Sequence, residues 1–71
     1  MEPTTYQICV RGRLTEHLGS AFVAAGMTVE AGEAETALIG WMRDQAELYG
    51  ALDRVRNLGL ELVSVLPHGR H

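Results

Sequence analysis

The sequence has few of the residues that give small proteins extra stability or chemistry. Its 71 residues include one cysteine, Cys9, so no disulfide can form within the chain. The three histidines, His17, His68 and His71, show no spacing typical of a metal site, and we expect neither a metal nor any other cofactor. All six basic residues are arginines, which excludes Schiff-base chemistry through a lysine.

Positive charge and long apolar runs are also scarce. The formal net charge of −3 argues against the basic surface that nucleic acids and anionic membranes require. No apolar run reaches the length of a membrane span, and residues 1–5 lack the basic and apolar regions of a signal peptide. With a lone thiol besides, we expect a cytoplasmic protein that has no nucleic-acid or membrane partner.

What the chain does contain is aliphatic residues and alanine, in the proportion typical of a folded domain. A domain of this length buries only about 60% of the surface that its unfolded chain exposes. Its core alone supplies about 3–5 kcal/mol of stability. Because neither a disulfide nor a metal is expected, self-association into a homodimer is the leading expectation.

Apolar periodicity predicts six elements. They are a strand over 6–14, a helix from the Thr15 cap to Gly26, strands over 27–30 and 36–42, a helix from the Asp44–Glu47 capping box to Gly59, and a strand over 60–66. The order β-α-β-β-α-β predicts a ferredoxin-like α+β fold, with two helices on one face of a four-stranded antiparallel sheet. We expect a single domain over 6–66, with flexible ends at 1–5 and 67–71.

The same periodicity separates a core from an open sheet face. The side chains expected to be almost fully buried are Ile8, Val10, Leu18, Phe22, Leu48, Leu52 and Val55. The residues expected on the face opposite the helices are Cys9, Arg11, Arg13, Ile39, Trp41, Val63 and Val65. A monomer does not normally expose so large an apolar surface, which favours a dimer interface or a ligand platform. The alternative is a shift of one residue in the third or fourth strand, which would bury Ile39 and Trp41 beneath the helices.

Two stretches carry resemblances to known families. The stretch Asp44–Val65 resembles the C-terminal half of short, uncharacterised actinobacterial proteins, and Val10–Leu14 is similar to their start. This resemblance implies a soluble cytoplasmic context and no known activity. The run of helix, Gly59 and strand is also similar to part of ACT-type regulatory domains, which share this topology and bind amino acids at dimer interfaces. The Asp44 turn lacks the glycine that follows the first strand of such domains.

These observations leave two functional hypotheses open. The first is a non-catalytic interaction or accessory module that forms a homodimer through the open face. The second is a small-molecule-binding regulatory domain, with Arg11, Arg13 and Trp41 lining a site at the dimer interface. Solvated arginines, or a cross-strand pair with Glu30, compete with that second hypothesis.

A catalytic role is not expected from these residues. Cys9 as a nucleophile would need a base such as His17 within hydrogen-bond reach, yet we expect the two on opposite sides of the sheet. A small apolar filler is therefore the preferred interpretation of Cys9, and no catalytic residue is assigned.

Overall fold

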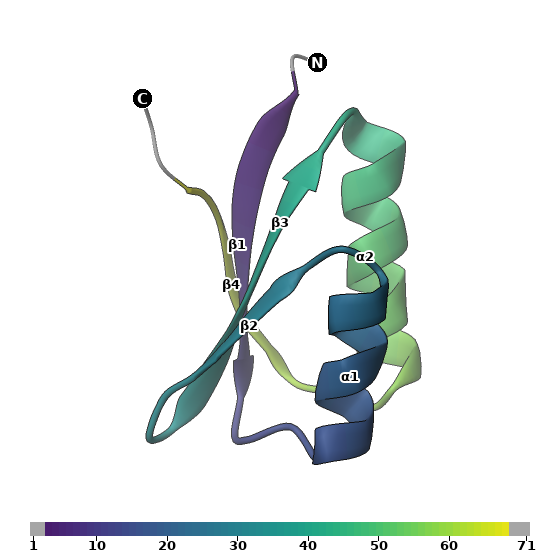
Figure 1. Ribbon diagram of the computed structural model, residues 1–71. Helices are drawn as coiled ribbons and strands as arrows, with labels where there is room; N and C mark the ends of the chain where they lie inside the picture. Colours follow the sequence, from purple (N-terminus) through teal and green to yellow (C-terminus); the bar gives the residue numbers. More distant parts are fainter. Residues whose placement is uncertain (1–2, 69–71) are drawn as a thin grey trace.

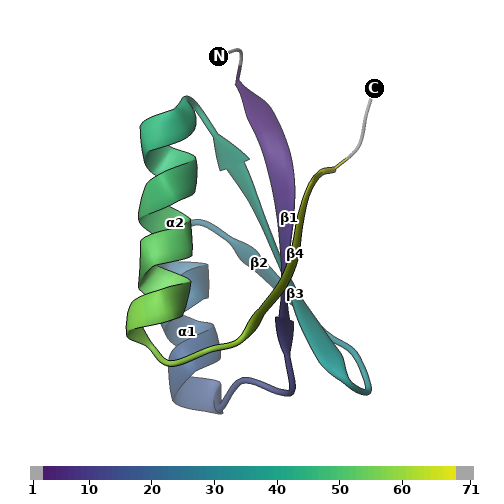
Figure 2. The same ribbon diagram turned by 180° about the vertical axis from the view of Figure 1, so that it is seen from behind.

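The computed structural model describes residues 3–68 as an open four-stranded antiparallel sheet with both helices on one side (Figures 1 and 2). The elements are β1 (Thr4–Arg11), α1 (Glu16–Ala24), β2 (Thr28–Ala31), β3 (Glu35–Met42), α2 (Gln45–Asn57) and β4 (Leu62–Pro67). The predicted order of elements is confirmed, and it is consistent with a ferredoxin-like fold. The parts of the expected flexible ends at 1–2 and 69–71 lie outside the described residues.

The sheet has the strand order β2-β3-β1-β4, so β1 and β3 are central and the other two strands form the edges. All three strand pairs are antiparallel. Ile8 of β1 lies opposite Leu38 of β3 on one side and Val65 of β4 on the other. Because residues directly opposite each other in a sheet share a face, these three form one row beneath the helices.

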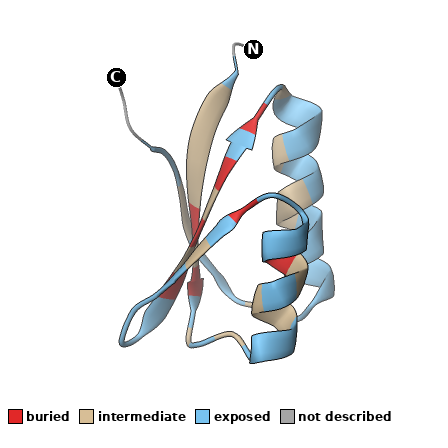
Figure 3. Cartoon of the chain, viewed as in Figure 1, coloured by how far each residue is buried: buried red, intermediate tan, exposed pale blue. Residues whose placement is uncertain are grey.

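The core is supplied mainly by the two central strands (Figure 3). Its buried apolar side chains are Ile8, Val10, Phe22, Met27, Leu38, Met42 and Val55. The expected full burial is therefore confirmed for Ile8, Val10, Phe22 and Val55. It is wrong for Leu18, Leu48 and Leu52, which are only half-buried. The reason is that a single layer of two helices covers the sheet, so a side chain on a helix flank keeps part of its surface in water.

The end of β1 differs from the prediction. The strand begins at Thr4 and stops at Arg11, because the next residue, Gly12, turns the chain at a φ of 82°. Positive φ is a conformation that glycine adopts without the steric strain of other residues. The turn is anchored on both sides: the Gly12 N–H donates to the Ala34 carbonyl at 2.7 Å, and the buried Thr36 hydroxyl donates to the Gly12 carbonyl at 2.8 Å. Arg13 consequently lies in a loop and not on the strand.

Both predicted helix caps are confirmed. The Thr15 side chain accepts the Leu18 N–H at 3.2 Å, and Asp44 Oδ1 accepts the Glu47 N–H at 3.0 Å. In the second cap, Glu47 Oε1 reaches back to accept the N–H of Arg43 at 2.6 Å. Within residues 3–68, neither helix has the length and apolar character needed to cross a membrane.

Candidate functional site

The face of the sheet that carries no helix is the first candidate site, and we name it the open face. Side chains alternate along a strand, so the neighbours of the buried residues Ile8, Leu38 and Met42 point to this side. The register then assigns it the following residues: Thr5, Gln7, Cys9 and Arg11 of β1, Thr28 and Glu30 of β2, Glu35, Ala37, Ile39 and Trp41 of β3, and Ser64 and Leu66 of β4.

An apolar stripe crosses the open face along β3. It consists of Ala37, Ile39 and Trp41, and Cys9 extends it onto β1 because Cys9 lies opposite Ala37. Trp41 is the most exposed of the large apolar side chains, at 62%. The predicted outward orientation of Ile39 and Trp41 is therefore confirmed, and the alternative register is wrong. We refer to these four residues as the β3 stripe.

Polar groups border the β3 stripe on both sides. Gln7 lies between Ile39 and Leu66 in one row of the sheet, and its amide donates to the Cys9 sulfur at 3.3 Å. Thr28 lies on the far side of Ile39. The open face is thus a narrow apolar strip in a mainly polar surface, which is the composition of many non-obligate protein interfaces.

The predicted outward orientation of Val65 in β4 is wrong. Leu62 pairs with Val10, whereas Ser64 pairs with Cys9, so two steps along β4 match one step along β1. Val63 is the extra residue of this β-bulge. The inserted residue reverses the alternation, so Val65 packs against the core on the helix side. In its place Leu66, which is 56% exposed, lies on the open face opposite Gln7.

The two arginines do not line a common site, as the second hypothesis would require. Arg11 Nε pairs with Glu61 Oε2 at 3.1 Å, and both side chains are 65% exposed. The acidic partner of Arg11 is therefore Glu61 and not Glu30, which the sequence suggested. Arg13 leaves the strand altogether at the Gly12 turn.

Arg11 and Trp41 also lie at opposite ends of the open face. Trp41 is opposite Thr5, six residues before Arg11 on β1, which corresponds to about 20 Å of strand. One copy of the chain therefore does not bring Arg11, Arg13 and Trp41 into a single site. Any ligand that touched both ends within one chain would have to span the length of the sheet.

The structure also separates Cys9 from His17. Cys9 lies on the open face, while His17 is in the first turn of α1 on the covered side. Among residues 3–68, no three side chains of His, Cys, Asp or Glu form a group that could hold a metal ion. The open face thus offers surface for contact, and it offers no assembled pair of nucleophile and base.

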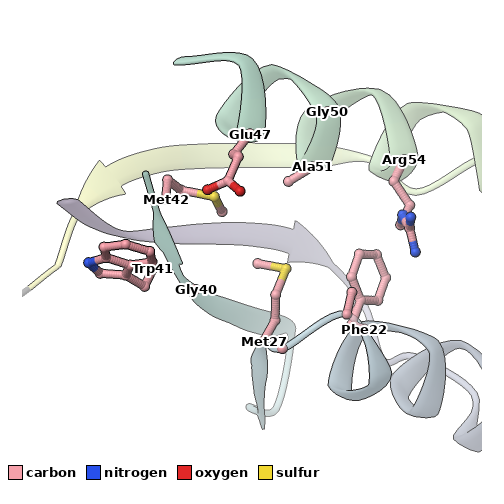
Figure 4. A pocket seen from close by; sticks show the side chains of 11 residues that line it. Phe22, Met27, Gly40, Trp41, Met42, Glu47, Gly50, Ala51 and Arg54 are labelled. Atoms are coloured by element: carbon pink, nitrogen blue, oxygen red, sulfur yellow. The ribbon is translucent and has the colours of Figure 1, made fainter. Parts of the chain in front are cut away.

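A second feature, which sequence reasoning did not identify, is a groove of about 300 Å³ between the two helices (Figure 4). Its lining comes from the end of α1, the segment before β2, the end of β3 and one side of α2: Phe22, Ala25, Gly26, Met27, Gly40, Trp41, Met42, Glu47, Gly50, Ala51 and Arg54. The only signal in the sequence was Gly50, a glycine in the middle of a helix. We name this feature the interhelical groove.

Comparison with known proteins places the chain in one family. No curated protein and no solved structure matches it. A family described as "Domain of unknown function (DUF8691)" matches residues 5–66. That range covers both helices and the whole sheet apart from the first residue of β1 and the last residue of β4. The chain belongs to this family.

Proposed function

We propose that this protein is a small non-catalytic interaction module that forms a homodimer through the open face. The observation that carries the proposal is the β3 stripe, an apolar strip with Trp41 62% exposed on a sheet face that no helix covers. Burying apolar surface contributes about 25 cal/mol of favourable free energy for each Å² removed from water. A matching strip on another protein surface is the simplest means of removing it.

A second copy of this chain is the partner that the size of the domain favours. Among residues 3–68 the buried apolar core consists of seven side chains, and the single cysteine leaves the chain without an internal disulfide. An interface of standard size takes about 800 Å² from each partner, which is about a sixth of the 4670 Å² that one chain exposes. The β3 stripe alone does not supply that area, so the dimer should use the whole open face, Leu66 included.

The test is the oligomeric state of a pair of matched variants. Sedimentation velocity of the wild-type chain at micromolar concentrations should give a dimer. Trp41→Glu places a charge in the interface and should shift the chain to a monomer. Tyr49→Glu is the control, since Tyr49 is an aromatic residue of nearly equal exposure, 58%, on helix α2 away from the open face.

Two results would contradict the proposal. One is a wild-type chain that stays monomeric at high micromolar concentration. The other is equal loss of the dimer in Trp41→Glu and Tyr49→Glu, which would place the interface elsewhere. Circular dichroism of each variant separates loss of the dimer from loss of the fold.

The regulatory alternative, an ACT-like ligand site lined by Arg11, Arg13 and Trp41, is the weaker proposal. It receives no support from the arrangement within one chain, because Arg13 is in a loop and Arg11 is about 20 Å along β1 from the position opposite Trp41.

A further inference from the structure

We propose that the interhelical groove binds a small ligand with an apolar body and one anionic group, such as a medium-chain carboxylate. The groove lies on the helix side of the sheet, and Trp41 is the one residue that both lines it and belongs to the β3 stripe. The argument for the ligand does not use Trp41, so this proposal does not depend on the homodimer proposed for the open face. Its volume of about 300 Å³ is at the lower end of the range for small-molecule sites.

The floor of the groove is apolar and adaptable. Phe22, Met27 and Met42 are 0%, 9% and 4% exposed, and Figure 4 shows the two methionine side chains directed into the space between α2 and β3. Methionine is unbranched and polarisable, so it adjusts to apolar groups of different shape. Gly40 permits this packing, because a Cβ at that position would lie 3.0 Å from the Met27 side chain. The floor therefore suits a flexible apolar chain.

An arginine at the rim of the groove accounts for the anionic group of the proposed ligand. Glu47 already accepts the Arg43 N–H at 2.6 Å and faces the Arg43 guanidinium at 3.7 Å. Arg56, elsewhere on α2, pairs with Asp53 at 3.1 Å. Arg54 has no ion pair within residues 3–68, and it extends from α2 beside Phe22 (Figure 4). Arg43 also lies 4.0 Å from Asp44, so it compensates Glu47 only in part. Among the residues that line the groove Arg54 is the one cation, seven residues along α2 from Glu47. At that end of the groove its guanidinium can bind a carboxylate through two hydrogen bonds.

Gly50 keeps the groove open. Glycine is poorly suited to a helix interior, yet nothing lies within 4 Å of the position that a Cβ would take here. Packing within the chain therefore does not require a glycine at this position. A larger side chain would project into the space that the proposed ligand occupies.

The experiment titrates octanoate, and the neutral octan-1-ol as its counterpart, into the ¹⁵N-labelled protein in the millimolar range. Saturable amide shifts are expected at Gly40, Gly50 and Ala51. Arg54→Gln should weaken octanoate binding about tenfold and leave octan-1-ol binding unchanged. Arg56→Gln, a substitution two residues away on the same helix, should change neither.

Gly50→Leu separates binding from folding. It fills the groove and improves helix propensity, so octanoate binding should disappear while the Tm stays at or above that of the wild type. The proposal is overturned by wild-type shifts that do not saturate, or by Gly50→Leu binding octanoate as the wild type does. It is likewise overturned if Arg54→Gln weakens binding of octan-1-ol as much as binding of octanoate, because the anionic group would then have no role.

Discussion

At the scale of single residues, the central strands follow elementary alternation, and Thr36 is a polar residue at one of the inward positions. Ile8 and Val10 are buried where the pattern of β1 predicts. Thr36 is also buried, at 1% exposure, although threonine is usually found nearer the surface. Its hydroxyl is satisfied by the Gly12 carbonyl, 24 residues away in sequence. Alternation with Leu38 places Thr36 on the buried side, but the distant carbonyl that makes burial of its hydroxyl possible cannot be inferred from local pattern.

Thr36→Val should destabilise the Gly12 turn. The variant removes the hydroxyl that donates to the Gly12 carbonyl, and we expect the free energy of unfolding to fall by about 1 kcal/mol. Hydrogen exchange at the Gly12 amide, which donates to Ala34, should become faster. Thr36→Ser is the control, because it loses a methyl group and keeps the hydroxyl. Equal exchange rates in the two variants would show that the hydroxyl does not hold the turn.

At the scale of elements, prediction succeeds where the local signals agree. Asp44, Glu47 and Gly59 mark α2 at both ends, and the structure places its boundaries within two residues of those signals. The face of β4 could not be predicted, since leucine and valine dominate residues 60–66 and a bulge leaves no mark in such a run. For this reason Val65 lies on the helix side where the prediction had it on the open face, and Leu66 lies on the open face in its place. The β3 stripe could be predicted because the partner strand, β1, alternates clearly.

The cap of α2 should contribute measurably to stability. Asp44→Ala removes the acceptor for the Glu47 N–H, and the free energy of unfolding measured in urea should fall by about 1 kcal/mol. Asp44→Ser retains an oxygen acceptor at the same position, so its free energy of unfolding should fall by much less than that of the alanine variant. The capping interpretation fails if alanine and serine are equally destabilising.

At the scale of the whole molecule, the proposed dimer links stability to concentration. A chain that folds and associates is stabilised by its partner through mass action, so the Tm of the wild type should rise with protein concentration. The Tm of Trp41→Glu should not depend on concentration. Calorimetry under reducing conditions is the measurement, because a disulfide between two copies of Cys9 would mimic association. A wild-type Tm that is constant over a hundredfold dilution would argue against the dimer.

The two edges of the sheet decide what kind of assembly this chain can build. On one side β2 has only four residues, and on the other β4 is interrupted by the Val63 bulge and closes with Pro67, which has no N–H to offer. Short strands, bulges and proline make an edge a poor template for another strand. Growth by edge-to-edge pairing, which leads to fibres, is thereby discouraged. Association through a face related by a two-fold axis ends at two copies, so the architecture favours a finite complex over an open-ended polymer.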